Sequence, residues 1–381
     1  MKRLFKFILG LFLTVVLIAV GFVSYLLVSY SRIGNVDLDI TNKSNLEEID
    51  SDQTYKVATY NIGFGAYSQD FTFFLDTGYD KDGNETCGHD SKAKSKDEVI
   101  KNTNGSIKTM KDLNLDFMLL QEVDIKSTRS HKVNQNEMFS KEFSEYDNVF
   151  CINFDSAFLP YPLYDMHGKS LAGLSTYSKY KIKEAYRKQY TISDSLSKFF
   201  DLDRCFSVSI LNVNNGKKLY LINSHMSAYD KGGTIRQKQI FELNEYLNSI
   251  KENNDYVVLG GDFNHDLLTY NPNFSYTKEN RAFNMTLKDP DWVASYFDEN
   301  CNSPLIDGYN VIASDNVPTC RNNDIPWDPN VTYRCVVDGF IFSNNIEIIT
   351  HYNIETKDAN LTYNGFAYSD HQPAYVEFKL L

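Results

Sequence analysis

The stretch VVLGGDFNHD, residues 257–266, joins an apolar run to side chains that could bind an ion. Asp262 and Asn264 are two residues apart, so on an extended backbone their side chains point to the same face. Their oxygens could hold a divalent cation or a phosphate at the end of a strand. A plain Asx turn after a strand would use the same residues, and this stretch alone does not decide between the two.

The same combination of an apolar run and a reactive side chain recurs along the chain. Four further predicted strands contain, or end at, an acid, an amide or a histidine. Two more residues of this kind stand just before the last predicted strand. These residues are Asn61, Glu122, His225, Asp338, Asp370 and His371. Each of them alone is more often structural, but their succession indicates that the strand ends meet in one site.

These motifs, in this order, resemble the endonuclease/exonuclease/phosphatase superfamily over roughly residues 54–381. GDFN at 261–264 and SDHQP at 369–373 carry most of the resemblance, together with QE at 121–122. The implied fold is an α+β, four-layer α/β/β/α sandwich like that of deoxyribonuclease I. The segments QEVDIKSTRSHKVNQ, HMSAYDKGGTIRQKQ and VVDGFIFS look more like a Firmicute branch that includes a proposed regulator of fibrinogen binding and a maltose-phosphate phosphatase.

The resemblance implies that three of these residues help to hold a metal ion. Glu122 would bind Mg²⁺ or Mn²⁺, with Asn61 beside it and Asp370 holding the same ion or a second one. Such ions favour a few carboxylates plus water and substrate oxygens, which fits these side chains. The sequence leaves open whether one or two metals act.

The resemblance also implies that the other five residues act on a phosphate ester. Asp262 would position or deprotonate the attacking water, and Asn264 would hold a phosphate oxygen. His371 would face the phosphate, with Asp338 fixing its tautomer. His225 would donate to the phosphoryl oxygens or assist the leaving group. The identity of the general base stays open.

Four more polar residues are candidates for substrate contact. Arg129 and Arg236 could pair with a second phosphate or an acidic substrate group. Arg236 lies on a predicted helix, where a structural role is the stronger expectation. His167 and Lys169 precede a predicted strand and could border the cleft, and plain solvation explains them and Arg129 equally well.

Charge and local sequence favour a small substrate over nucleic acid. The formal charge is −12, and once three basic residues among the first thirty are subtracted from 38, 35 basic side chains face 50 acidic ones. Binding to nucleic acid draws on a basic surface. Nuclease members of the superfamily commonly carry an Asn before an LSR-like strand, where this chain reads AGLSTYS, and often a Tyr or His where it has Gly339.

Three functional interpretations follow from these observations. The favoured one is a monomeric phosphoesterase that acts on a phosphomonoester or a small phosphodiester, such as a sugar phosphate or a lipid headgroup. The second is an extracellular nuclease of the same fold, which would share all the core residues. The third is a catalytically idle surface binding module, against which stands the occupation of every expected catalytic position.

The N-terminal segment reads as a membrane anchor. Residues 7–30 carry no charge and are long enough to cross a bilayer. Three basic residues precede them, which predicts that the N-terminus stays in the cytoplasm. A cleavable signal peptide would have a shorter apolar core and a small-x-small cleavage site. We expect a cytoplasmic segment at 1–6, an uncleaved signal anchor in the cell membrane at 7–30, a stalk at 31–53 and an extracytoplasmic catalytic domain at 54–381.

Short apolar strands alternate with loops in the remainder of the chain. Helices are expected at 97–113 and 234–251, the second with apolar residues along one side. This mixture argues for one α+β domain built on two packed sheets. Strands are expected at 55–61, 116–122, 148–153, 173–178, 206–211, 218–224, 256–262, 336–342 and 373–379.

The six cysteines leave the redox state open. Outside the cell they would permit up to three disulfides, but several free buried thiols fit the sequence equally well. No CxxC pair is present, which argues against a zinc site of that type.

Overall fold

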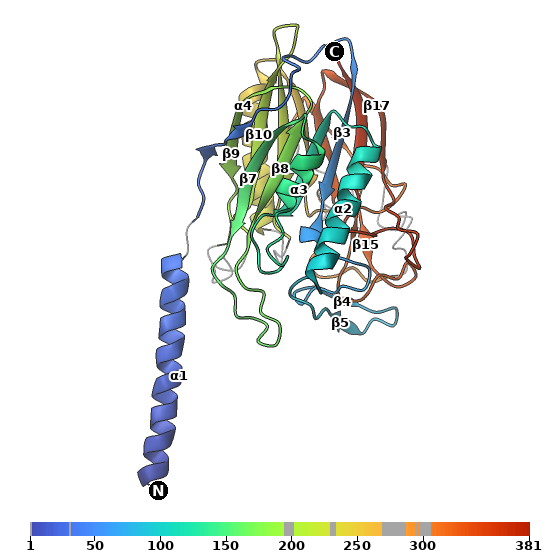
Figure 1. Ribbon diagram of the computed structural model, residues 1–381. Helices are drawn as coiled ribbons and strands as arrows, with labels where there is room; N and C mark the ends of the chain where they lie inside the picture. The colour runs from blue at the N-terminus through green and yellow to red at the C-terminus, as the bar shows by residue number, and fades with distance from the viewer. Residues whose placement is uncertain are drawn as a thin grey trace.

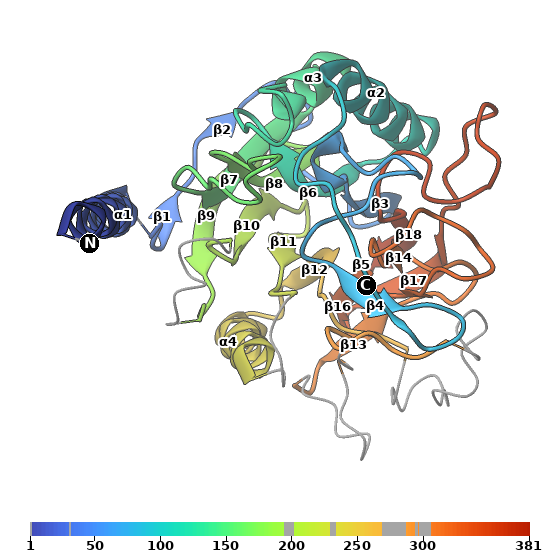
Figure 2. The ribbon, with the colours of Figure 1, turned by 90° about the horizontal axis from the view of Figure 1, so that it is seen from below.

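The computed structural model describes residues 2–29, 32–193, 202–228, 234–268, 287–293, 296 and 306–381. Two large sheets pack face to face, and helices cover their outer faces, as Figure 2 shows from below. One long helix extends from the domain at the N-terminus (Figure 1). The fold is therefore the expected α+β, four-layer α/β/β/α sandwich preceded by an apolar helix.

The described residues form two sheets of seven strands and two short ribbons. The first sheet has the order β1 (Val36–Asp37), β9 (Ile182–Gln189), β10 (Cys205–Asn212), β11 (Lys218–His225), β12 (Tyr256–Asp262), β16 (Asp338–Ser343) and β13 (Tyr309–Ile312). The second has the order β17 (Ile346–Asn353), β18 (Ala374–Leu380), β3 (Thr54–Asn61), β6 (Phe117–Asp124), β8 (Leu171–Ser178), β7 (Asp147–Asp155) and β2 (Ile40–Thr41). The ribbons pair β4 (Thr77–Tyr79) with β5 (Glu85–Cys87) and β14 (Cys320–Arg321) with β15 (Arg334–Cys335).

A parallel pair of strands lies near the centre of each sheet, and a helix connects its two members. β3 and β6 run parallel and flank α2 (Lys96–Asp112), while β11 and β12 run parallel and flank α4 (Thr234–Lys251). Parallel strands need such a crossover, which places the helix on a face of the sheet. Because both strands of a pair run the same way, their C-terminal ends meet at one edge of the sheet.

Three apolar layers hold the sandwich together. Between the sheets, Leu119 of β6 and Val258 of β12 belong to one buried cluster. Met110 of α2 and Phe139 of α3 (Gln135–Glu142) pack on the outer face of the second sheet, and Leu243 of α4 packs on the first. Each large apolar side chain buried in this way contributes roughly 1.5–3 kcal/mol. These layers therefore fix the strand ends of one sheet relative to those of the other.

All nine predicted strands and both predicted helices are present, and their ends lie within two residues of those expected. The structure adds elements that the sequence did not reveal. β17 at the edge of its sheet and β9, next to the two-residue edge strand β1, are partly exposed and mix polar with apolar residues, so they lack the apolar run of a central strand. α3 and the β4–β5 ribbon lie within segments expected to be loops.

The stalk expected over residues 31–53 is wrong from residue 36 onward. β1 pairs with β9, and β2 pairs with β7, so this segment runs along one edge of both sheets. Ile49 is fully buried between the sheets. The domain therefore begins at about residue 36, shortly after α1 (Lys2–Ser29), which is long and apolar enough to cross a membrane.

Two pairs of cysteines lie close together. Cys151 of β7 and Cys205 of β10 come from different sheets, and their Sγ atoms are 3.6 Å apart. Cys320 and Cys335 face each other across the β14–β15 ribbon. All four are free thiols and buried. Cys301 lies outside the described residues.

Candidate active site

The C-terminal ends of the central strands bring Asn61 and Asp262 together across the two sheets. Asn61 ends β3 and Asp262 ends β12, and Asn61 Nδ2 donates to Asp262 Oδ2 at 3.0 Å. The same amide nitrogen lies 3.4 Å from Glu122 Oε1 and 3.5 Å from His371 Nε2. Asn61 is therefore the centre of a buried polar cluster drawn from both sheets.

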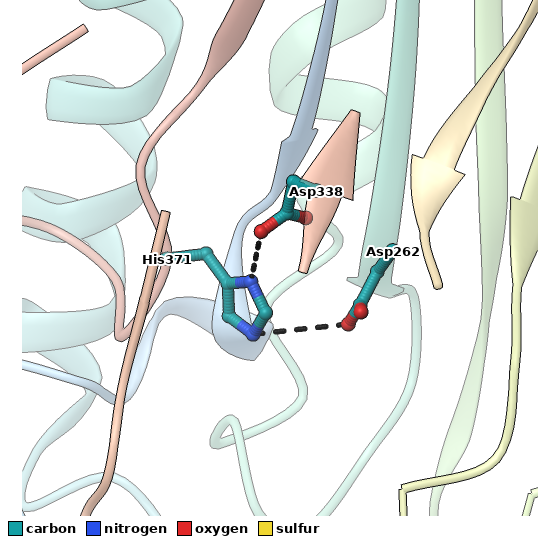
Figure 3. Close-up of side chains that lie close together, drawn as sticks. All are labelled: Asp262, Asp338 and His371. Carbon is teal, nitrogen blue, oxygen red and sulfur yellow. Dashed lines mark hydrogen bonds and ion pairs between the residues drawn. The ribbon is translucent and has the colours of Figure 1, made fainter. Parts of the chain in front are cut away.

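His371 stands between two carboxylates, as Figure 3 shows. Its Nδ1 is 2.7 Å from Asp338 Oδ2, and its Nε2 is 3.7 Å from Asp262 Oδ2. Burial lowers the pKa of His371, but the charges of Asp338 and Asp262 outweigh burial and hold the pKa well above its ordinary value. His371 is therefore a cation at neutral pH, with Asp338 fixing its ring and Nε2–H directed toward the cluster.

Asp262 has the properties of a proton acceptor near neutral pH. Burial raises the pKa of Asp262 to about 6, and the charge of Asp338 adds to this effect. His225, at the end of β11, places Nε2 3.5 Å from Asp262 Oδ2. Burial and the charges of Arg204 and His371 lower the pKa of His225 well below its ordinary value, so this imidazole is neutral. A base with a pKa close to the working pH is the efficient one.

The Asx turn considered from the sequence is present, and it orients Asp262. The backbone N–H of Asn264 donates to Asp262 Oδ1 at 2.8 Å, and Asn264 has a left-handed φ of 50°. Asn264 Nδ2 donates to the carbonyl of Met226 at 2.9 Å, next to His225. At Gly261, a Cβ would lie 1.9 Å from the Ser224 carbonyl oxygen, so glycine lets β11 and β12 approach.

Glu122 faces the site because β6 is irregular at this point. The pairing of β6 with β8 shifts register between Leu120 and Val123, and Glu122 has a φ of 53°. Such irregularities re-aim side chains and cluster beside active sites. Burial raises the pKa of Glu122. The nearby charge of Arg129, whose Nη2 is 4.0 Å from Glu122 Oε2, lowers it by a smaller amount.

Asp370 adds a further carboxylate to this part of the site. Its Oδ2 accepts from Asn323 Nδ2 at 2.9 Å, and its Oδ1 accepts from Ser369 Oγ at 3.2 Å. The charge of Asp370 also contributes to the raised pKa of Glu122. The two acids therefore affect each other electrostatically within one region.

A cleft of about 830 Å³ opens onto these residues. Its polar lining includes Glu122, His225, Asp262, Asp370 and His371. Aromatic residues line it as well, namely Phe64, Tyr67, Phe73, Phe74, Phe154, Tyr161 and Trp292. Apolar walls around a few convergent polar groups are typical of sites for small molecules.

The model of the Endonuclease/Exonuclease/phosphatase family matches residues 58–371. The chain belongs to this family. Like the family's enzymes, it is a hydrolase that acts on phosphate ester bonds. No curated protein sequence matches the chain.

Solved structures of family enzymes share the fold at low sequence identity. TDP2 from D. rerio, solved with a single-strand DNA product, has a TM-score of 0.51 at 14% identity, with 86% of this chain and 100% of that chain covered. A Beutenbergia cavernae endonuclease/exonuclease/phosphatase has a TM-score of 0.52 at 12% identity, covering 86% and 72%. ANGEL2, a 2',3'-cyclic phosphatase, has a TM-score of 0.53 at 14% identity, covering 91% and 99%. These similarities establish the fold.

Family enzymes generally use divalent metals, and the donors around Asn61 fit such an ion. Glu122 and Asp370 offer carboxylate oxygens, which are donors that Mg²⁺ and Mn²⁺ prefer. Asn61 lies beside Glu122 with its amide nitrogen 3.4 Å from Oε1, and its amide oxygen accepts from the backbone N–H of Gly63 at 3.0 Å. The raised pKa of Glu122 shows that the nearby charge of Arg129 does not fully offset burial. A divalent cation would supply the missing positive charge.

A second group of ligand atoms is close enough to hold an ion. Atoms of Asp262, Asp338 and His371 all lie within 4.8 Å of one another. However, His371 Nδ1 and Asp338 Oδ2 already share a short hydrogen bond, and His371 is a cation. A protonated imidazole is no metal ligand, so this group fits an acid–base role better than a metal site.

Arg129 is held rigidly at the edge of the cleft. Its Nη2 donates to Asp124 at 2.9 Å and its Nε donates to the same carboxylate at 3.2 Å. Its guanidinium carbon lies 3.9 Å from the centre of the Phe64 ring. These contacts present a fixed cation beside Glu122, where a substrate phosphate could reach it.

The other three candidate substrate residues occupy different positions. His167 lines the cleft as expected, and burial lowers its pKa to about 4, so it is a neutral group there. Lys169 lies outside the cleft and pairs with Asp155 at 3.3 Å. Arg236 is buried and donates to the backbone carbonyls of Asn264 and Trp292, so it positions the loop behind the site.

Two buried arginines of the cleft were not found from the sequence. Arg204 directly precedes β10. Because Cys205 of β10 pairs with His225 at the end of the antiparallel β11, Arg204 lies beside the C-terminal end of β11 and lines the cleft. A search for charged residues at strand starts would have found it. Arg321 donates to the Ser68 carbonyl at 3.1 Å and lies in a long segment without any periodic signal.

Proposed function

We propose that the protein is a membrane-anchored, extracytoplasmic, divalent-metal-dependent phosphoesterase. It hydrolyses a phosphomonoester or a small phosphodiester by attack of an activated water. The observation that carries this proposal is the meeting of Asn61, Asp262 and the Asp338–His371 pair beside one cleft, which Asp262 and His371 line.

Asp262 and His371 have complementary protonation properties in this mechanism. Asp262, with its pKa raised to about 6, orients the attacking water and accepts its proton. His371, held charged by Asp338, donates from Nε2 to a phosphoryl oxygen, where negative charge grows during attack. The two groups lie 3.7 Å apart, so a water bound to Asp262 and a phosphoryl oxygen bound to His371 would lie side by side at the cleft surface.

Glu122 and Asp370 would hold the metal ion, either Mg²⁺ or Mn²⁺, with Asn61 beside Glu122. When bound, such an ion offsets charge on the phosphoryl oxygens and lowers the pKa of a bound water. Asn61 would also keep Asp262 oriented through its 3.0 Å hydrogen bond.

His225 and Asn264 complete the polar floor opposite His371. His225 is neutral, so it can donate one hydrogen bond to a phosphoryl or leaving-group oxygen without adding charge. Asn264 lines the cleft next to it and would hold a phosphate oxygen. Arg129 would bind a second anionic group of the substrate.

The anchoring part of the proposal rests on α1. Its apolar window of 18 residues has a mean hydropathy of 2.7, and no residue of that window is buried. Basic residues at its start and none at its end favour a cytoplasmic N-terminus. The catalytic domain would then stand as a monomer on the outer side of the cell membrane.

The substrate class is argued from charge and from the cleft. The acidic chain lacks the basic excess on which nucleic-acid binding draws, which favours a small phosphoester over a polymer. A sugar phosphate or a lipid headgroup would suit a cleft of this volume. We also propose, on the motifs quoted above, placement in the Firmicute branch with the maltose-phosphate phosphatase.

The test uses the full chain in detergent micelles, with Mg²⁺, with Mn²⁺ or with EDTA. Sugar phosphates, sphingomyelin, bis-p-nitrophenyl phosphate and plasmid DNA are offered in parallel, and Asp262→Asn serves as the inactive control. Metal-dependent release of phosphate or headgroup, without nicking of DNA, supports the proposal. Efficient nicking of DNA would support a nuclease instead, and no hydrolysis of any substrate would contradict catalysis.

A further inference from the structure

The loop between β7 and β8 carries a concentration of exposed apolar side chains. We call residues 157–166 the apolar loop. Its exposed members are Phe158, Tyr161, Leu163, Tyr164 and Met166. Leu163 and Tyr164 are 77% and 76% exposed. Outside α1, the other exposed large apolar residues of the described chain are scattered singly or in pairs, so this patch calls for a partner.

The apolar loop is in direct contact with α1. Leu26 of α1 packs against Ala157, with Phe22 beside them. The backbone N–H of Phe158 donates to the Tyr25 hydroxyl at 2.9 Å. In Figure 1 this loop, drawn in green, extends below the sheets in the direction in which α1 leaves the domain.

The contact point fixes the height of the loop on the helix. Tyr25 lies four residues before the end of α1 at Ser29. The ends of a spanning helix lie at the membrane–water interface, where tyrosine is enriched. The apolar loop is therefore held at the level of the interface whenever α1 crosses a bilayer.

We propose that the apolar loop rests in the bilayer beside α1, with Leu163 and Tyr164 in contact with lipid. This proposal rests on the membrane anchoring proposed above. The argument for lipid over a protein partner is continuity, because the exposed patch adjoins the very helix that lipid would surround. Apolar and aromatic side chains on a surface element are the usual means of interfacial attachment.

The opposite side of the loop borders the active-site cleft. Leu159 and Tyr161 line the cleft, and the Tyr161 ring lies 5.8 Å from that of Phe74. One short segment therefore separates the reacting groups from the lipid surface. This position favours phosphoesters that are carried by the bilayer or released at it. The membrane would thus be the source of the substrate for the proposed activity.

The test measures the depth of the loop in the full chain, reconstituted in phosphatidylcholine–phosphatidylglycerol vesicles. In a Cys87→Ser/Cys301→Ser background, which removes the exposed thiol of the described residues and the cysteine outside them, an environment-sensitive fluorophore is attached through Leu163→Cys. Leu17→Cys in the middle of α1 and Ile349→Cys on β17 serve as matched exposed positions. Vesicles carry lipids with a nitroxide quencher near the headgroup or near the middle of the acyl chain.

We expect the probe at 163 to lose emission most with the shallow quencher, the probe at 17 most with the deep one, and the probe at 349 with neither. If 163 behaves like 349 while 17 is quenched, the anchoring stands and this proposal is wrong. If 17 is unquenched, the anchoring is wrong and this proposal fails with it. Emission at 163 that depends on protein density and not on quencher would identify a second copy as the partner and overturn lipid contact.

Discussion

Asn61 and Asp262 belong to different sheets, yet Asn61 Nδ2 donates to Asp262 Oδ2 at 3.0 Å. The packing of the two sheets therefore sets the geometry of the proposed base. Burial raises the pKa of Asp262 to about 6, so its ionised form costs stability at neutral pH while it serves the reaction. Function and stability are opposed at this residue.

Asp262→Asn should lower kcat for bis-p-nitrophenyl phosphate by roughly 10²–10⁴, the contribution of a positioned general base. In EDTA its Tm should rise, because a buried charge is removed. Steady-state kinetics and thermal unfolding check the two effects. Asp112→Asn on the exposed surface of α2 is the matched control. Retained activity in Asp262→Asn would remove the proposed base.

Asp338→Asn should shift the alkaline limit of activity to lower pH. The charge of Asp338 helps to hold the pKa of His371 well above its ordinary value, so its loss lowers that pKa. If protonated His371 donates to the phosphate, the variant then loses activity at a pH where the wild type still works. The pH profile of kcat/KM measures this limit. An unchanged alkaline limb, with lower activity throughout, would point to a purely structural role for Asp338.

Glu122→Gln should weaken binding of Mn²⁺ by at least about tenfold, since even loss of an outer partner of a ligand costs 10–100-fold. Isothermal titration of Mn²⁺ into metal-stripped protein measures this without reference to activity. Glu137→Gln, on the exposed face of α3, is the control and should bind like the wild type. Equal affinity in all three proteins would move the metal away from Glu122.

If the domain is extracytoplasmic as proposed, Cys151 and Cys205 should form a disulfide there, since their Sγ atoms are 3.6 Å apart as thiols. Closing a loop of this length stabilises a domain by about 4 kcal/mol in the chain-entropy account. Peptide mapping without reduction identifies the pair, and denaturant unfolding with and without reductant measures the effect. Complete alkylation of both cysteines in unreduced, denatured protein would show that they stay free.

His167 should make the fold less stable in acid. Burial, followed by the charge of Arg129, lowers its pKa from 6.5 to about 4. Between these two pH values His167 is protonated in the unfolded chain and neutral in the folded one. The free energy of unfolding therefore falls as pH drops from about 6.5 towards 4. The loss reaches roughly 3 kcal/mol at the lower limit. The free energy of unfolding, measured with urea, should depend less on pH across this range for His167→Gln than for the wild type or for the exposed control His89→Gln.

The sequence predicted the central strands because strands buried on both faces are continuous apolar runs. It also predicted which residues meet at the site, because the motifs stand where those runs stop, as with Glu122 and His225. β17, at a sheet edge, and β9, next to one, escaped detection because partly exposed strands mix polar and apolar residues.

Long-range packing decided the positions that the sequence could not. Lys169 and Arg236 are near the motifs in sequence, yet one pairs with Asp155 on the surface and the other is buried behind the site. Arg321 reaches the cleft from a segment with no periodic signal. The residues before β3 read as a spacer because two-residue strands are too short to leave a pattern.

Only residues 30–35 separate α1 from β1. Even fully extended, a segment of this length spans roughly 25 Å. If α1 spans a membrane as proposed, the catalytic domain is confined to a thin layer above it, and its rate on phosphoesters carried by the bilayer follows their number per unit of surface area. Dilution of the surrounding medium would leave such a rate unchanged. A single proteolytic cut between 30 and 35 would remove the covalent link to α1 and leave the apolar loop alone to hold the domain at the surface.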